Sequence, residues 1–412
     1  MERVHERCCG LDVHKETVVA CLRTPGERGR RKVEVRTFGT TTPELLTLGD
    51  WLIEHRCSHA AMESTGVYWK PVFNLLESVC EVLLVNARHI KMVPGRKTDV
   101  KDCEWIAELL ELGLLRSSFI PPEPIRDLRD VTRYRKTLIQ QRAAESNRVQ
   151  KLLELANIKL GNVATDVLGA SGRAMMDALI AGERDAQTLM RLAKGQLKRK
   201  RTALVPALTG RFTHHHAFLL GQLLAHIDEL GEHIAQCDRK VDEYLRPFVQ
   251  EADLLQTIPG VGRRTAEVII AEIGVEMDRF ASAAHLASWA ALCPGNNESA
   301  GKRRSGKTRK GNQWLRRALV EAAWSASHTR TTYLSSLYSR VARRRGAKKA
   351  AVAVAHSTLV AVWHILKHHV PYQDLGPSHF DKLHTERLRR HYLRRLEDLG
   401  LKVTVETINE AA

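Results

Sequence analysis

The chain has 412 residues, too many for one ordinary domain, and a hydrophobic content of 43% that suits a globular protein of two or three modules. Its 64 Lys and Arg against 47 Asp and Glu give a net charge of +17 at pH 7, so nucleic acid is the first partner to consider. No run of about 18 apolar residues is evident that could span a bilayer. The opening residues lack the apolar stretch of a signal peptide, and we expect a cytoplasmic protein.

The eight cysteines are scattered along the chain, and none forms a CxxC pair. Without a secretory signal, such cysteines are typical of reduced thiols in a core rather than of a disulfide framework. Their spacing also fits no structural zinc site.

The N-terminal region alternates between strand and helix patterns, which indicates an α/β sheet. Strands are expected where Val and Ala are frequent or where apolar and polar residues alternate, and a helix where Pro43 stands in the first turn. In chain order we expect two strands within 8–22, a strand at 32–38, a helix at 42–56, a strand at 58–62, a helix near 70–78 and a strand at 81–85.

The pattern turns helical from residue 124 to residue 255. The last helix of this stretch carries apolar residues three and four apart, which is the spacing of a coiled-coil seam. The seam predicts dimerisation or a long antiparallel hairpin, and an amphipathic helix packed inside one protomer is the alternative. Its residues are Leu220, Leu223, Ile227, Leu230, Ile234, Cys237, Val241 and Tyr244.

A third module begins near Leu254 and ends near His369, before a short charged tail. From Gly301 to Ala350 it has fifteen Lys or Arg and a single acid, Glu321. We therefore divide the chain into an α/β domain at 1–122, a helical coiled-coil region at 123–252, a mostly helical domain at 253–370 and a tail at 371–412.

Four carboxylates in the first domain are candidate metal ligands. Asp12 follows the opening strand and Glu63 ends another, so both can project from one edge of a sheet. Asp99 and Asp102 are three residues apart on one face of an expected helix. Carboxylate oxygens select Mg²⁺ or Mn²⁺, and two such ions would clamp a phosphodiester. By itself the set is weak evidence, because Asp12 can begin a turn and Asp99 can be a helix N-terminal acid.

Residues 258–262, IPGVG, lie between two apolar helical segments and resemble a helix-hairpin-helix. In that motif glycines let backbone N–H groups approach a phosphate at a helix N-terminus, so Gly260 and Gly262 are candidate nucleic-acid contacts. A purely structural turn between two packed helices is the alternative.

Residues 291–317 are rich in Pro, Gly, Lys and Arg, and phosphate contact is the natural interpretation. Ser299 stands among cations that would stabilise both an alkoxide and the phosphate that it attacks. By chemistry alone Ser305 is an equal candidate, and a solvated basic loop with incidental serines is the alternative. The basic candidates for phosphate contact are Lys302, Arg303, Arg304, Lys307, Arg309 and Lys310.

Trp289, Trp314 and Trp324 interleave with this basic region and are candidates for stacking on bases. Trp324 lies on an apolar helical stretch, and we expect it to anchor the core instead. The histidines at 214–216 look like a metal tract, but their side chains diverge and nothing nearby completes a site, so no metal is expected there.

Five separated segments carry a family resemblance and span most of residues 8–325. They read GLDVHKETV, AMESTGVYW, NARHIKMVPGRKTDVKDCEWIAELL, IPGVGRRTA and PGNNESAGKRRSGKTRKGNQWLRRAL. In this order they resemble the DEDD transposases of the insertion-sequence-110 family. The resemblance implies a RuvC-like ribonuclease-H fold for the first domain, with the four carboxylates as the DEDD metal ligands. It also implies a transposase domain whose nucleophile, in the pattern PxxxxSxGK, is Ser299 followed by Lys302, whereas Ser305 has no counterpart.

Members of this family form a DNA–phosphoserine link and build the active site from two domains contributed by different protomers. The resemblance therefore implies a homo-oligomer, a dimer or a tetramer, that exchanges strands between donor and target DNA with Mg²⁺. It further implies guidance by a structured non-coding bridge RNA. The long helical middle and the tail after His369 depart from shorter members.

Two other functions remain open from the residues alone. A metal-dependent DNA junction endonuclease would use water as the nucleophile, and its third module would only bind DNA. A non-enzymatic nucleic-acid-binding protein would keep the basic module and need none of the four carboxylates.

Overall fold

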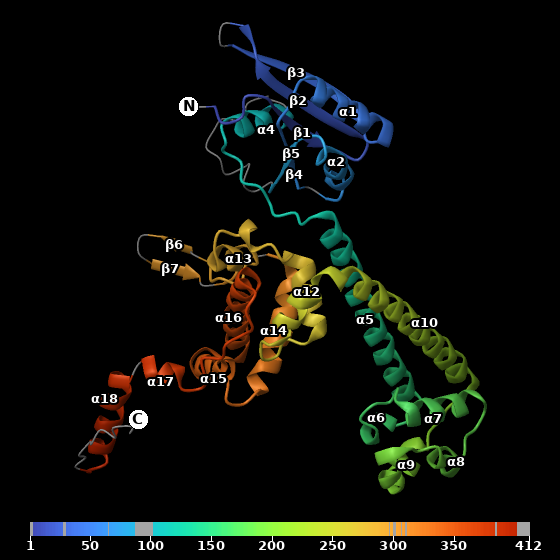
Figure 1. The fold of residues 1–412 in the computed structure, drawn as a ribbon. Coiled ribbons are helices and arrows are strands. Elements are labelled where there is room, and N and C mark those ends of the chain that lie inside the picture. Colours follow the sequence, from blue (N-terminus) through green and yellow to red (C-terminus); the bar gives the residue numbers. More distant parts are fainter. Residues whose placement is uncertain are drawn as a thin grey trace. The chain divides into compact units, whose positions relative to one another are not determined.

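The computed structural model describes residues 3–27, 30–64, 66–86, 102–295, 297–299, 302–305, 307–309, 311–383 and 385–401. The chain forms two compact units, Met1–Ile120 and Pro121–Ala412 (Figure 1). The division into four segments that we expected from the sequence stays a prediction.

The first unit is built on a five-stranded sheet in the order β3-β2-β1-β4-β5. β1 pairs antiparallel with β2, and β2 with β3, whereas β1, β4 and β5 run parallel. The strands are β1 (Cys8–Val13), β2 (Thr17–Pro25), β3 (Arg31–Gly39), β4 (His59–Glu63) and β5 (Glu81–Val85). The predicted α/β class of this region is therefore confirmed.

Helices cover both faces of this sheet (Figure 1). Because successive side chains of a strand point to opposite faces, Leu11 and Met62 pack with α1 (Thr42–Glu54) and α2 (Trp69–Leu76). Cys8 and Ala61 face the other way and pack with α4 (Asp102–Glu111). The sheet thus separates the α1–α2 layer from α4, and α4 begins with a predicted site residue.

The helical middle region is a long antiparallel hairpin of α5 (Glu123–Leu155) and α10 (His214–Leu245) (Figure 1). Leu138 of α5 clusters with Leu230 and Ile234 of α10, whereas Val149, a later residue of α5, clusters with Leu220, an earlier residue of α10. The predicted seam therefore faces another helix of the same chain, as in the hairpin that we expected as one outcome.

The buried seam differs in detail from the predicted one. Leu223, Cys237 and Tyr244 are only partly buried. Leu220, Ile227, Ile234 and Val241 keep the seven-residue spacing of the seam, whereas Leu224 and Leu245 are buried in place of their neighbours Leu223 and Tyr244. The α10 residues that are buried are Ala217, Leu220, Leu224, Ile227, Leu230, Ile234, Val241 and Leu245.

Short helices close the far end of the hairpin (Figure 1). They are α6 (Leu160–Val163), α7 (Ala170–Ile180), α8 (Ala186–Arg191), η2 (Gly195–Lys200) and α9 (Arg201–Leu208). In the histidine tract that follows, Thr213 and His216 form a capping box, in which the Thr213 N–H donates to His216 Nδ1 at 3.1 Å. His216 therefore caps the N-terminus of α10.

The C-terminal part of the second unit is mostly helical and also holds a short hairpin. Its elements up to the hairpin are η3 (Arg246–Phe248), α11 (Val249–Gln256), α12 (Arg263–Ile273), η4 (Met277–Arg279), α13 (Ala283–Trp289), β6 (Asn297–Ser299) and β7 (Lys302–Ser305). After it come α14 (Gln313–His328), α15 (Tyr333–Arg345), α16 (Ala347–His368), α17 (His379–Leu383) and α18 (Thr385–Asp398).

Helix α16 is the exception to our expectation that no segment could span a bilayer. It has 22 residues with a hydropathy of 1.4, and by length and composition alone such a helix could cross a membrane. Half of its apolar window is buried, and α16 packs against α13, α14 and α15. A helix buried in this way is a core helix, and its apolar residues pack within the unit.

Candidate active site

Asp12 and Glu63 lie side by side at the carboxyl ends of two parallel strands. The last paired residues of β1 and β4 are Leu11 and Met62, and each candidate carboxylate comes one residue later. Glu63 is still paired with Val85 of β5. By the alternation of side chains, both carboxylates lie on the face of the sheet that α4 covers.

Asp102 reaches the same edge because of how α4 packs on β1. Gly10 permits a close approach: a Cβ there would lie 2.1 Å from the carbonyl oxygen of Cys103 and 2.4 Å from the nitrogen of Ala107. Cys8, two residues earlier, donates to the carbonyl oxygen of Ala107 at 3.7 Å. Helix α4 therefore runs antiparallel to β1, and its first residue, Asp102, lies toward the edge where Asp12 ends β1.

The structure thus places three of the four predicted carboxylates, Asp12, Glu63 and Asp102, at one edge of the sheet. Asp99 lies outside the described residues. Within the described ranges, no three side chains of His, Cys, Asp or Glu stand close enough together to hold a metal ion. The donor set is nevertheless of the right chemistry, since carboxylate oxygens are the ligands that Mg²⁺ and Mn²⁺ prefer.

His14 is a neighbour of this edge that our sequence analysis missed. Its Nε2 lies 3.2 Å from Oδ2 of Asp12, and its side chain is 60% exposed. The two residues are two apart, so in an extended segment they share a face. That spacing, visible in the segment LDVHK, was the available signal.

A buried carboxylate at the other end of α4 also escaped the sequence analysis. Glu111 is 3% exposed, and its Oε2 accepts from Arg23 Nε at 2.6 Å. Its Oε1 lies 2.8 Å from Arg31 Nε and 3.3 Å from Arg3 Nε. These cations come from β2, β3 and the N-terminal segment, so they fix the C-terminal end of α4 relative to the sheet.

The thiols of this unit are core residues. All eight cysteines are free, as predicted. Burial raises the pKa of Cys8 to about 11 and that of Cys21 to about 12. A thiol with so high a pKa is protonated at neutral pH and unreactive, so these cysteines serve packing rather than chemistry.

The two candidate glycines in the turn between α11 and α12 lie in different surroundings. Gly260 has φ +85°, and a Cβ there would lie 2.4 Å from the carbonyl oxygen of Ala322 and 2.6 Å from the nitrogen of Ala326. Gly260 therefore permits close packing of the turn on α14. Gly262, the N-cap of α12, has no atom within 4 Å of a Cβ position, so only Gly262 leaves space for a phosphate.

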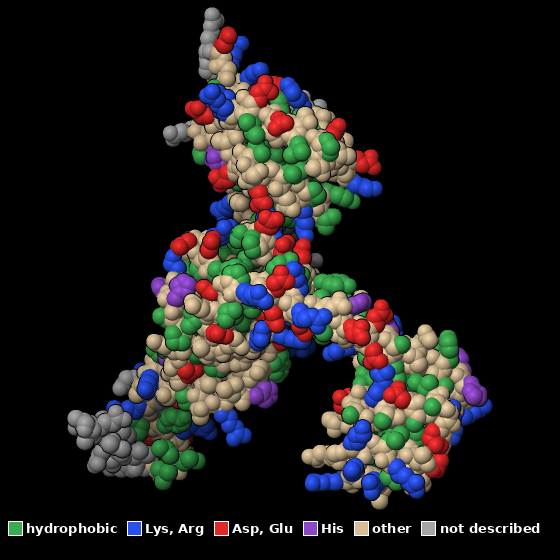
Figure 2. Space-filling model, turned by 45° about the vertical axis from the view of Figure 1, so that its right-hand side comes forward, with side chains coloured by type: hydrophobic (Ala, Val, Ile, Leu, Met, Phe, Trp, Pro, Cys, Tyr) green, Lys and Arg blue, Asp and Glu red, His purple; other side chains and the backbone are tan. Residues whose placement is uncertain are grey.

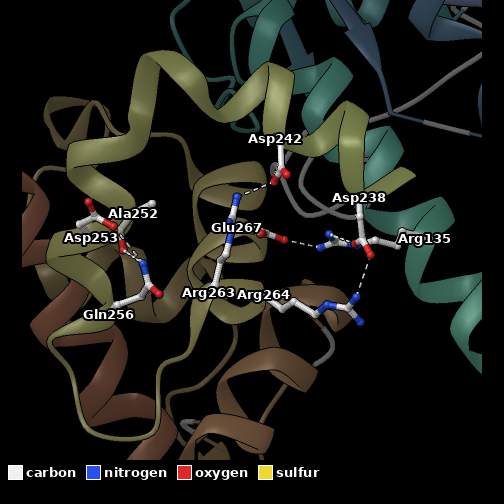
Figure 3. Close-up of polar contacts among 9 residues, drawn as sticks. All are labelled: Arg135, Asp238, Asp242, Ala252, Asp253, Gln256, Arg263, Arg264 and Glu267. Carbon is white, nitrogen blue, oxygen red and sulfur yellow. Dashed lines mark hydrogen bonds and ion pairs between the residues drawn. The ribbon is translucent and has the colours of Figure 1, made fainter. Parts of the chain in front are cut away.

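Ion pairs occupy the two arginines that open α12 (Figure 3). Arg263 donates to Asp242 of α10 at 2.6 Å, and Arg264 to Asp238 at 2.9 Å. Arg135 of α5 joins the same group, with bonds of 2.8 Å to Asp238 and 2.6 Å to Glu267. The turn is thereby tied to the helical hairpin by charge.

The hairpin of β6 and β7 holds the candidate nucleophile. Its register pairs Ser299 with Lys302 and Ser305 with Asn297. Only the backbone of these residues is described, and the side chains of the two candidate serines lie outside the described part of the chain.

The remaining basic candidates divide in the same way. The side chains of Lys302, Arg303 and Arg304, and all of Lys310, lie outside the described residues. Lys307 is exposed, and Arg309 donates to Ser288 Oγ at 3.2 Å.

The three tryptophans lie in different surroundings. Trp289 and Trp314 are half-buried, whereas Trp324 is 42% exposed and its ring centroid lies 5.6 Å from that of Tyr338. Our prediction that Trp324 anchors the core was wrong, because the buried face of α14 leaves it out. That face consists of Leu315, Ala318, Leu319, Ala322, Ala323 and Ala326.

A second basic cluster lies at the far end of the hairpin, outside the stretch that our sequence analysis singled out. Figure 2 shows Lys and Arg side chains gathered on this end. Lys198, Arg199 and Lys200 form the last turn of η2, and all three are exposed, as is Arg201. The run LKRKR was the signal, and it offers a further surface for phosphates.

Two family models match the chain. A model for DEDD transposases of the IS110 type, described as "Transposase", matches residues 9–158. A second, described as "Transposase IS116/IS110/IS902 family", matches residues 252–339. Together the two matches cover more than half of the 412 residues.

Two curated relatives are similar over much of their length. The transposase for insertion sequence element IS1111A of Coxiella burnetii is 22% identical over 300 residues, which are 70% of this chain and 72% of that protein. An uncharacterized 44.8 kDa protein of insertion element IS116 from Streptomyces clavuligerus is 28% identical over 272 residues. That match covers 57% of this chain and 65% of the relative, just under two thirds of its length.

Proposed function

Since this chain belongs to the IS110 family of transposases and is therefore an enzyme that acts on DNA, we propose that it exchanges DNA strands through a phosphoserine on Ser299. The observation that carries the proposal is the shared edge of Asp12, Glu63 and Asp102. With Asp99 as the fourth member, these carboxylates would gather negative charge that a bound divalent cation neutralises. They are the residues that would hold Mg²⁺ or Mn²⁺.

The fold that we propose for the first unit is RuvC-like, of the ribonuclease-H type. Its support is the sheet order, with β2 and β3 antiparallel on one side of β1 and β4 and β5 parallel on the other. In such a sheet the carboxyl ends of the two central parallel strands, β1 and β4, are neighbours, which is where Asp12 and Glu63 stand.

Ser299 acts as the nucleophile. Its deprotonated Oγ forms a bond to the phosphorus of a DNA phosphodiester while the bond from phosphorus to the leaving sugar oxygen breaks, and that oxygen takes up a proton. A sugar hydroxyl of the partner strand then attacks the phosphoserine, restores a phosphodiester and returns the proton to Ser299. One phosphorus–oxygen bond forms for each that breaks, so exchange needs no external energy source.

Charge stabilisation comes from two sets of groups. Lys302 is the backbone partner of Ser299 in the hairpin, and its cation would stabilise the charge on the phosphate as the serine attacks. A divalent cation, when bound by the carboxylates, polarises the phosphate oxygens. The two units thus serve one reaction, with protomers of a homo-oligomer contributing them.

A non-coding bridge RNA is part of the proposal because of the family resemblance. The net charge of +17 supports a polyanionic partner beyond a short DNA site. Pairing of such an RNA with donor and target DNA would supply the sequence specificity, so that the protein needs few base-specific contacts.

The test is a covalent protein–DNA adduct. The full chain is incubated with donor and target DNA, the RNA from its own element and Mg²⁺, and the products are separated under denaturing conditions. We expect an adduct in the wild type that is lost in Ser299→Ala and retained in the matched control Ser305→Ala. An undiminished adduct in Ser299→Ala contradicts the serine assignment.

Two further outcomes separate the alternatives. Free 5′-phosphate ends with no adduct would identify a junction endonuclease that uses water. Asp12→Ala should abolish both adduct and cleavage, and full activity without the carboxylates would contradict the metal assignment. Omitting the RNA tests guidance, since we expect no exchange without it.

A further inference from the structure

A cavity of about 260 Å³ lies between α5, α12 and α14 of the second unit. Trp314 lines it together with aliphatic side chains such as Ile139 and Ala318, and the lining has five basic side chains against two acidic ones. None of these residues belongs to the four carboxylates or to the serine hairpin. The cavity therefore has an aromatic wall and a mostly basic lining, and none of its residues takes part in the proposed chemistry.

Most of its cations are already neutralised by protein carboxylates. Arg133 makes two bonds to Glu272, of 2.7 and 2.8 Å. Arg135 and Arg264 pair with Asp238 and Glu267 in the network that Figure 3 shows. These pairs build the wall of the cavity rather than its binding groups.

Two cations remain for a ligand. Lys136 donates to Glu321 at 3.0 and 3.2 Å, but Glu321 is 63% exposed, and such a pair contributes little in water. Arg317 is exposed, and no described residue pairs with its guanidinium. A phosphate can replace Glu321 on Lys136 and take Arg317 as a second partner.

Trp314 is positioned firmly. Its backbone N–H donates to the side chain of Asn312, the N-cap of α14, at 3.0 Å, and Asn312 in turn donates to the buried Glu272 at 2.5 Å. Arg133 Cζ lies 5.8 Å from the ring centroid, within range of a cation–π contact. The cap thus fixes the first turn of α14, directly after the basic hairpin region, and the indole on that turn lies beside the Arg133 guanidinium.

We propose that this cavity binds one unpaired nucleotide, with its base against Trp314 and its phosphate on Lys136 and Arg317. The volume falls below the about 300 Å³ at which pockets begin to enclose drug-sized ligands, so it suits a single base. An aromatic ring beside cations is how proteins hold single-stranded nucleic acid. The inference rests on the proposed function for its source, since strand exchange and RNA pairing both create unpaired nucleotides.

The first experiment removes the aromatic wall. Single-stranded DNA and RNA of the same sequence, each with one 2-aminopurine, are titrated with the full chain, and quenching of its fluorescence reports stacking. We expect Trp314→Ala to weaken binding roughly 5- to 150-fold, the effect of one lost base–aromatic stack, and to abolish the quench. Trp314→Phe keeps a ring and should retain most of both.

The matched control is Trp324→Ala. Trp324 lies on the same helix, is 42% exposed and does not line the cavity, so its removal should leave binding and quench unchanged. Whichever of the two nucleic acids loses more affinity in Trp314→Ala identifies the source of the nucleotide. Equal affinities of Trp314→Ala and wild type for both strands, or equal losses in the two tryptophan variants, overturn the proposal.

The second experiment tests the side chains proposed to bind the phosphate, because their variants should change the affinity in opposite directions. Arg317→Gln should weaken binding and reduce its salt dependence by about one phosphate contact, whereas Arg316→Gln, next to it but outside the lining, should not. Glu321→Gln should strengthen binding, because it removes the competitor for Lys136. If these residues had a purely structural role, the two variants would not change the affinity in opposite directions. Weaker binding in Glu321→Gln contradicts the proposal.

These results are separable from the test of strand exchange. A wild type that forms the Ser299 adduct while Trp314→Ala binds single strands normally would refute the cavity and leave the proposed function intact. A wild type without an adduct, whose single-strand affinity still depends on Trp314, would refute the serine chemistry and support the cavity.

Discussion

The two units position their candidate sites by different physical means. In the first, α4 lies so close to β1 that Gly10 has no room for a Cβ, and the carboxylate edge depends on that fit. In the second, α5, α10 and α12 are joined by ion pairs around the buried carboxylate Glu267 (Figure 3), and a second buried carboxylate, Glu272, pairs with Arg133 of α5. Steric fit therefore governs the proposed metal edge, and charge neutralisation governs the helices around the cavity.

The largest effect is expected from Arg135→Ala. Its guanidinium is 5% exposed and pairs with Glu267, which is 3% exposed, so the variant removes the only buried cation bonded to this buried carboxylate among the described residues. Breaking such a pair costs about 3–5 kcal/mol of unfolding free energy, measured by urea denaturation. Arg263 pairs with the same Glu267 but is 61% exposed, and Arg263→Ala should cost only about 0.2–1 kcal/mol. Equal losses would mean that burial does not decide the strength of this network.

Gly10→Ala tests the steric side of the comparison. The new Cβ would overlap the backbone of α4, and overpacking of this kind costs about 1–3 kcal/mol. Because α4 must shift, the variant should also reduce formation of the DNA adduct. The control is Gly49→Ala within α1, where the Cβ would lie 3.6 Å from Val79.

For Gly49→Ala we expect a gain of roughly 0.5–1 kcal/mol from helix propensity and unchanged adduct formation. A loss as large as that of Gly10→Ala would show that the close approach of α4 is not special.

The smallest effect concerns an exposed pair. The Arg173 guanidinium, 2.7 Å from Asp228, lowers the pKa of that carboxyl. A folded pKa below the unfolded value of about 3.9 gives stability that is present above the unfolded pKa and lost as the pH falls through the folded one. Asp228→Asn should therefore cost about 0.2–1 kcal/mol at neutral pH, and the difference from the wild type should shrink on acidification. A difference independent of pH would exclude this pair as its cause.

The sequence carried the local features well and the long-range ones poorly. Short apolar segments located the strands that carry Asp12 and Glu63, period-two alternation located the strand at 32–38, and both carboxylates were expected at strand ends. The ion pair of Arg23 with Glu111 joins residues 88 apart in the chain, and no local pattern signals such a pair. Likewise, Gly260 suggested a phosphate contact from its spacing, but its contact with Ala322 depends on where α14 packs.

The candidate nucleophile could likewise be predicted only in part from its local sequence. Chemistry alone could not rank Ser299 above Ser305, since both lie among cations, and only the order of five motifs favoured Ser299. The membership of the IS110 family, first indicated by those motifs, is confirmed by the two family models. The cavity beside Trp314 could not be predicted, because its walls come from three helices distant in sequence.

The most direct measurement is to identify the residue that becomes linked to DNA. The adduct formed with Mg²⁺ is digested with trypsin and nuclease, and the modified peptide is sequenced by mass spectrometry. The account predicts a nucleotide phosphate on Ser299. A link to any other residue, Ser305 included, or complete strand exchange without a covalent intermediate, would contradict it.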